Sequence, residues 1–168
     1  MSGIDAYVWL AATRAQGLPA PLASLSAQQW EESTEQPLRD FIGFMQSAHR
    51  RLVSRGGGRI VVVIPTIAMT GAAGLAPWSA VADGCRALVK SAARVWGAAS
   101  ITANCVAVPA ALLAGTEDDI SRSDLQQPAL PDPHLRDVAG VIASLCRAEM
   151  GAVSGATIGV DGGRWMNP

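Results

Sequence analysis

The chain has 168 residues, which suits one domain with a buried core of its own. Hydrophobic residues make up 49% and charged residues 16%, an apolar balance that indicates a sheet buried on both faces or a large subunit interface. The formal net charge of -1 disfavours nucleic acid and acidic membrane surfaces as partners.

Two further observations bear on the compartment. The N-terminus carries Asp5 and Arg14 around a short apolar patch, which makes a poor signal peptide, and no apolar run is long enough for a transmembrane helix. Cys85, Cys105 and Cys146 are odd in number and isolated among apolar neighbours. They indicate reduced core thiols of a cytoplasmic protein, without a disulfide framework, metal cluster or nucleophile.

The first third of the chain predicts a strand and a long helix. Residues 4–11 are apolar and fit a buried parallel strand that begins almost at the first residue. A proline-rich loop follows, and Ser26 to Gln29 fits a capping box that opens a helix over 27–54. Pro37 lies inside this helix, where it removes a backbone hydrogen bond, so we expect a kink there.

The centre of the chain predicts the candidate site. Gly56, Gly57 and Gly58 end the helix, and the β-branched run over 59–66 makes a strand buried on both faces. A loop and an Ala-rich helix over 78–96 follow. Ligands of open α/β sheets bind at the C-terminal edge of the strands, so we expect any site here. The polar groups near that edge are Thr66, Thr70 and Ser79, which also fit turn and helix-cap hydrogen bonds.

The last third predicts two more strands. Residues 101–108 form a strand, 110–133 a long loop, and Asp132 with Pro133 an N-cap and first turn of a helix that runs to about 150. Residues 156–160 form a final strand before an Asp-Gly-Gly turn.

This order of elements resembles the C-terminal two-thirds of the short-chain dehydrogenase/reductase family, in particular a 3-oxoacyl-[acyl-carrier-protein] reductase-like member. The similarity is carried by the central strand with its following helix, by Val108-Pro109-Ala110 where the family has Pro-Gly, and by Val160-Asp161-Gly162-Gly163 at the end. It implies a truncated Rossmann-like α/β fold in three layers. About four parallel strands, the family's strands 4-5-6-7, would be flanked by helices in a single domain over 1–168.

The resemblance also implies that the family's chemistry is absent. The family's catalytic Ser, Tyr, Lys and Asn fall at Pro65, Trp78, Ala82 and Pro37. The amides that support the cofactor fall at Trp9 and Leu10, and the three glycines at 56–58 precede a strand and cannot replace the family's phosphate-binding turn. We therefore expect neither catalytic residues nor a cofactor, and we expect no metal site.

The retained half of the family fold is the half that associates. In the family, helices matching 27–54 and 78–96 pack on their copies in a neighbouring subunit, which implies interface positions on both helices. The candidates are Phe41, Met45, Leu88, Ala92 and Trp96. We therefore expect an obligate homo- or hetero-oligomer, preferably a non-catalytic structural or regulatory subunit of a full-length, active relative. The interface should bury more than roughly 2,000 Å², and something must cover the strand edge at 4–11.

One alternative comes from a different class. A pocket under the loop at 110–133 would bind a hydrophobic acyl or polyketide-like ligand, as a binding protein or as an enzyme that needs no nicotinamide. Thr66, Thr70 or Ser79 would position that ligand.

Overall fold

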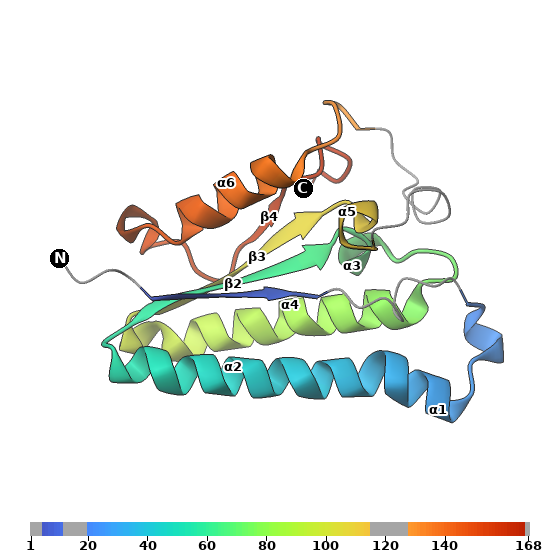
Figure 1. Cartoon of the computed structure of the whole chain (residues 1–168), viewed down its shortest axis with the longest axis horizontal. Helices are drawn as coiled ribbons and strands as arrows, with labels where there is room; N and C mark the ends of the chain where they lie inside the picture. The colour runs from blue at the N-terminus through green and yellow to red at the C-terminus, as the bar shows by residue number, and fades with distance from the viewer. Residues whose placement is uncertain (1–4, 12–19, 115–127, 167–168) are drawn as a thin grey trace.

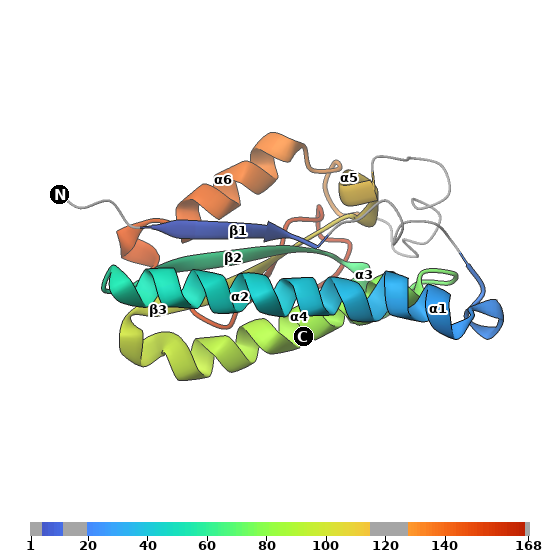
Figure 2. The same cartoon turned by 60° about the horizontal axis from the view of Figure 1, so that its bottom comes forward.

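The computed structural model describes residues 5–11, 20–114 and 128–166. Its sheet has four parallel strands in the order β1-β2-β3-β4. The strands are β1 (Ala6–Leu10), β2 (Gly58–Pro65), β3 (Ile101–Val108) and β4 (Thr157–Gly159). Helices α2 and α4 lie along one face and α6 lies on the other (Figures 1 and 2). The predicted three-layer α/β architecture is therefore confirmed.

The two central strands carry the core. Every residue of β2 and of β3 is buried, as the continuous apolar runs predict for a parallel sheet covered on both faces. Because side chains alternate along a strand, Ile60, Val62 and Ile64 pack toward α2 and α4, while Val61 and Val63 pack toward α6.

The long N-terminal helix is interrupted where proline requires it. Ser26 caps α1 (Ala27–Trp30) through the predicted capping box. A π-helical segment η2 (Glu31–Glu35) then leads into α2 (Gln36–Ser54). Pro37 is the second residue of α2 and lies just after this wider turn; because α1 and η2 precede it without a break, its missing N–H removes one helical hydrogen bond. The predicted distortion is present, but it is a wider turn ahead of the proline, and the helix continues in the same direction (Figure 2).

Glycines make the turn from α2 into β2. Gly56 and Gly57 have φ angles of 80° and 131°, which glycine adopts without strain. A Cβ on Gly57 would lie 2.7 Å from the Ser100 carbonyl oxygen, so the close approach also excludes a side chain. The predicted helix stop is confirmed.

The segments after β2 and β3 contain short helices that the sequence did not predict. The remaining helical elements are η1 (Leu22–Ser24), α3 (Ile67–Thr70), α4 (Ala76–Trp96), η3 (Gly97–Ala99), α5 (Ala110–Ala114), α6 (Leu135–Leu145) and η5 (Ala148–Met150). The predicted loop at 110–133 thus begins as a helix, and 115–127 lie outside the described residues.

The start of α6 also differs from the prediction. His134 is the N-cap, and its backbone N–H donates to Asp137 Oδ2 at 2.7 Å. Asp132 instead accepts a hydrogen bond from Arg164 Nη2 and joins the start of α6 to the C-terminal turn. Asp132 therefore forms a long-range ion pair, which the local sequence does not encode, and does not cap the helix.

β1 is an edge of the sheet, as predicted for residues 4–11; residue 4 itself lies outside the described residues. Arg59 N donates to Asp5 O and Ala11 N donates to Val63 O, each at 2.9 Å. Because parallel ladders use alternate residues, the outward backbone groups belong to Ala6, Val8 and Leu10. The prediction of a buried strand is wrong, because no residue of β1 is buried and Val8 and Leu10 are 44% and 56% exposed at the open edge.

Candidate functional site

Three of the four positions that the resemblance assigns to catalytic residues, Pro65, Trp78 and Ala82, lie near the C-terminal end of β2. Pro65 ends this strand and is buried, and α4 brings Trp78 and Ala82 to the same end of the core with 1% and 0% exposure. The Trp78 indole Nε1 donates to the Ala11 carbonyl oxygen at 2.9 Å. This hydrogen bond ties the end of the edge strand to α4.

Packing occupies the neighbourhood of Trp78. The indole belongs to a buried cluster with Ile67, Leu75 and Ala110. An indole N–H only donates a hydrogen bond and does not titrate near neutral pH, and proline and alanine side chains carry no acid or base. Proton transfer at these positions therefore has no side chain to perform it.

The three residual polar candidates do not form one polar site. Thr70 is exposed, and its Oγ1 donates to the Gly71 carbonyl oxygen at 3.0 Å, so it stabilises a turn. Thr66 Oγ1 and Ser79 Oγ are buried without a hydrogen-bond partner among the described residues. The expected cap hydrogen bond is absent at Thr66, so the hydroxyls of Thr66 and Ser79 are both unsatisfied among the described residues.

Cys85 and Cys105 lie in the core, and the partly buried Cys146 packs against it. Burial raises the pKa of Cys85 and of Cys105 to about 12, and it also raises the pKa of Cys146. All three are free thiols, as predicted. At neutral pH a pKa this high leaves almost no thiolate, so Cys85 and Cys105 are inert.

We expect this inertness to show in alkylation. At pH 8, native protein treated with iodoacetamide should carry label at Cys146 long before Cys85 or Cys105, because Cys146 is half-buried and the other two are fully buried. Peptide mass spectrometry measures the order, and denatured protein, in which all three react, is the control. Early label on Cys105 would contradict the closed core around β3.

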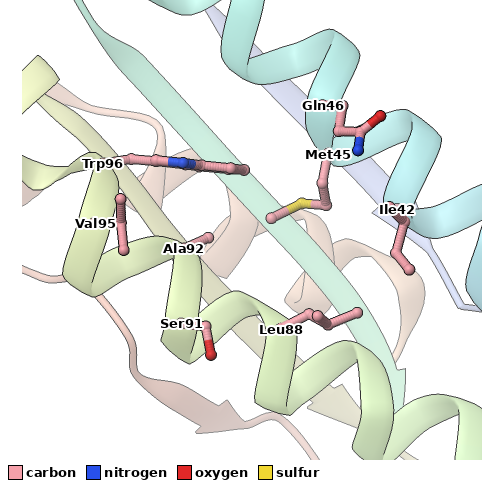
Figure 3. A pocket seen from close by; sticks show the side chains of 8 residues that line it. All are labelled: Ile42, Met45, Gln46, Leu88, Ser91, Ala92, Val95 and Trp96. Carbon is pink, nitrogen blue, oxygen red and sulfur yellow. The ribbon is translucent and has the colours of Figure 1, made fainter.

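An apolar groove separates α2 from α4. It has a volume of about 270 Å³, and Figure 3 shows Met45 reaching from α2 toward α4. Its lining contains four of the five predicted interface residues: Met45, Leu88, Ala92 and Trp96. The His49 ring lies 4.6 Å from the Trp96 ring and fixes the end of the groove.

Phe41 corrects the interface prediction. It is fully buried inside the chain, 5.7 Å from the ring of Trp9 and 6.2 Å from that of Phe44, and so it faces the sheet. Its neighbour Ile42 faces the groove and is 41% exposed. The sequence analysis missed Ile42 and Val95, although Leu88 and Val95 at i and i+7 share one helical face.

The described residues contain neither a candidate metal centre nor a candidate membrane span. No group of three His, Cys, Asp or Glu side chains there could hold a metal ion. Within the same ranges, no helix has the length and apolar character needed to cross a membrane.

The fold and the site can now be set against known proteins. A family model described as enoyl-(acyl carrier protein) reductase matches residues 1–164. The chain belongs to the short-chain dehydrogenase/reductase family. The chain is 27% identical over 150 residues to a 3-oxoacyl-[acyl-carrier-protein] reductase of Staphylococcus aureus, covering 86% of this chain and 61% of the relative.

A second curated relative and a solved structure are also similar to this chain. A (2S)-[(R)-hydroxy(phenyl)methyl]succinyl-CoA dehydrogenase subunit of Thauera aromatica is 31% identical over 150 residues, covering 85% of this chain and 59% of the relative. The acetoin dehydrogenase of Enterobacter cloacae has the same fold, with a TM-score of 0.79 at 23% identity over 99% of this chain and 68% of that one. The chain thus spans about three fifths of the length of these curated short-chain dehydrogenases/reductases.

Proposed function

We propose that this chain is a non-catalytic subunit of the short-chain dehydrogenase/reductase family that associates with a full-length, active relative. The single observation that carries the proposal is Trp78, which stands at the family's tyrosine position and is fully buried in an apolar cluster. Ala82, at the lysine position, is buried as well. Because core side chains occupy both the tyrosine and the lysine positions, the chain retains the family's scaffold and its role is structural.

The groove between α2 and α4 supports the association. Ile42, Leu88 and Val95 are 41%, 36% and 72% exposed on its rim, and an apolar surface of this kind on a single chain marks an interaction site. An active family member that presents the same two helices would cover it. The Thauera aromatica relative, which is named as a subunit of a dehydrogenase, supports a role within a larger enzyme.

The proposed subunit is a single domain located in the cytoplasm. We infer that residues 1–168 form one domain that acts as a structural or regulatory partner. The free cysteines suit the cytoplasm. A homo-oligomer is the other possible assembly, and co-expression with a full-length, active reductase from the same organism distinguishes the two. A tagged chain should purify with that reductase in fixed stoichiometry, and purification as a homodimer in its presence would contradict the proposal.

Nucleotide binding gives a direct test of the non-catalytic assignment. The isolated chain should bind neither NAD nor NADP, because apolar Trp9 and Leu10 replace the cofactor-supporting amides and a proline-containing turn at 108–110 replaces the nicotinamide contact. Isothermal titration calorimetry measures this, and an intact family reductase titrated in parallel is the positive control. Micromolar affinity for either nucleotide would show that the chain retains a cofactor site.

A second candidate function rests on the hydroxyls of Thr66 and Ser79. Both are buried without a partner among the described residues, which is the state expected of groups that await a ligand. A hydrophobic acyl ligand bound near α5 would give these two hydroxyls a hydrogen-bond partner. A stable lone chain that binds a fluorescent fatty acid, and loses it on Thr66→Val, would favour this candidate over the subunit.

A further inference from the structure

A second cleft lies beside α4 and shares no residue with the groove between α2 and α4. It has a volume of about 470 Å³ and is lined by side chains of α3, α4 and β4 and of the C-terminal turn. Unlike the groove, it is lined by charged groups: Arg86, Lys90 and Asp83 all come from α4. None of these residues belongs to the catalytic positions considered above.

The two cations stand one helical turn apart. Residues at i and i+4 are neighbours on a helix surface, so Arg86 and Lys90 repel each other, and an anion between them would relieve that repulsion. Lys90 has no ion-pair or hydrogen-bond partner among the described residues. Asp83 is the one carboxylate in the lining, so the cleft has an excess of positive charge.

Asp83 orients Arg86 without saturating it. Its Oδ1 accepts from Arg86 Nε at 2.8 Å and lies 2.7 Å from Arg86 Nη2. A guanidinium has five N–H donors, and the other donors of Arg86 have no partner in the described part of the chain. The side chain is 26% exposed, so the guanidinium is held in place and still accessible.

The floor of the cleft adds a neutral donor. Thr157 Oγ1 is buried without a hydrogen-bond partner among the described residues, apart from a polar contact with the Cys105 thiol. Burial raises the Cys105 pKa, while the charges of Arg86 and Lys90 both act to lower it. Arg86, Lys90 and Thr157 all line the cleft, so the two cations and the hydroxyl border the same space.

We propose that this cleft binds the oxyanion of a small ligand, a phosphate or carboxylate group, between Arg86 and Lys90 with the Thr157 hydroxyl as a third donor. The planar guanidinium fork matches two oxygens of such a group, and the ammonium adds a point charge. The volume exceeds that of a bare ion, so the organic part of the ligand would lie against Met69. This site does not depend on the proposed subunit function.

Inorganic phosphate is the probe that tests the site. In a titration of the ¹⁵N-labelled full chain, phosphate should shift the amide resonances of 86–90 and 155–157 saturably, whereas sodium chloride at equal ionic strength should not. Lys90→Gln and Arg86→Gln should each weaken binding at least about fivefold, since each removes a charge-assisted contact. Arg94→Gln, the same charge change at an exposed residue of α4 outside the cleft, should alter the dissociation constant less than about twofold.

Each result of these titrations either supports the anion site or overturns it. Equal shifts with chloride, or equal affinities of the Lys90→Gln and Arg94→Gln proteins, would overturn the proposal. Lys90 is exposed, so its replacement leaves the fold intact and keeps the test valid even where Arg86→Gln disturbs the Asp83 pair. A parallel titration with acetate identifies the source: tighter phosphate binding assigns a phosphorylated ligand, and tighter acetate binding assigns a carboxylate.

Discussion

Trp78→Ala should lower the free energy of unfolding by about 4 kcal/mol, the largest effect expected of a single substitution here. The indole is 1% exposed, so its removal leaves a cavity among Ile67, Leu75 and Ala110. It also leaves the Ala11 carbonyl oxygen without its donor. Because whole domains are stable by only about 5–15 kcal/mol, this loss removes a large fraction of the total stability and should lower the midpoint of unfolding markedly.

Urea unfolding at fixed protein concentration measures this change. Trp78→Phe is the matched control, because it keeps an aromatic ring in the cluster and loses the Nε1 donor to Ala11. It should cost about 1–2 kcal/mol. A loss below about 1 kcal/mol for Trp78→Ala would mean that the indole is no structural replacement for the family's tyrosine.

The paired substitution Leu88→Glu with Val95→Glu should abolish assembly while the single chain stays folded. Both side chains lie on the groove rim and are 36% and 72% exposed, so glutamates there remain solvated in the free chain. In an assembly each charge would be buried unpaired, and we expect association to weaken at least about a hundredfold, which corresponds to roughly 3 kcal/mol. Analytical ultracentrifugation with and without the partner reductase measures the change.

The control for this experiment lies on the same helix. Ala80→Glu with Ala87→Glu introduces the same charges at the same spacing on exposed residues of α4 that do not line the groove. Assembly should persist in that protein. Persistence of assembly in the Leu88→Glu and Val95→Glu protein as well would exclude the groove as the interface. Charges at Met45 and Ala92 give no such test, because both residues are buried in the chain's own core.

The sequence predicted the sheet because its signals are local. The apolar runs of β2 and β3 and the positive-φ glycines before β2 specify their conformation without help from distant residues. The same holds for the capping box at Ser26, which satisfies backbone donors within one turn.

Features that depend on distant contacts were predicted poorly. Asp132 appeared to be a cap, but Arg164 binds it across the C-terminal turn. Phe41 appeared to be an interface residue, because helical periodicity gives a face and does not say whether the sheet or a partner covers it. The cleft at Arg86 and Lys90 went unnoticed because its floor comes from β4, which lies far along the chain.

The parallel ladder also governs how the chain can fold. Ala6 pairs with Arg59, Gly58 with Ile101 and Cys105 with Thr157, so every strand pairing closes a loop on the order of fifty residues. No hairpin can nucleate this sheet, and β1 leaves the ribosome long before β2 exists to receive it. We therefore expect slow folding, during which the apolar segment of β1 stays exposed and prone to aggregation.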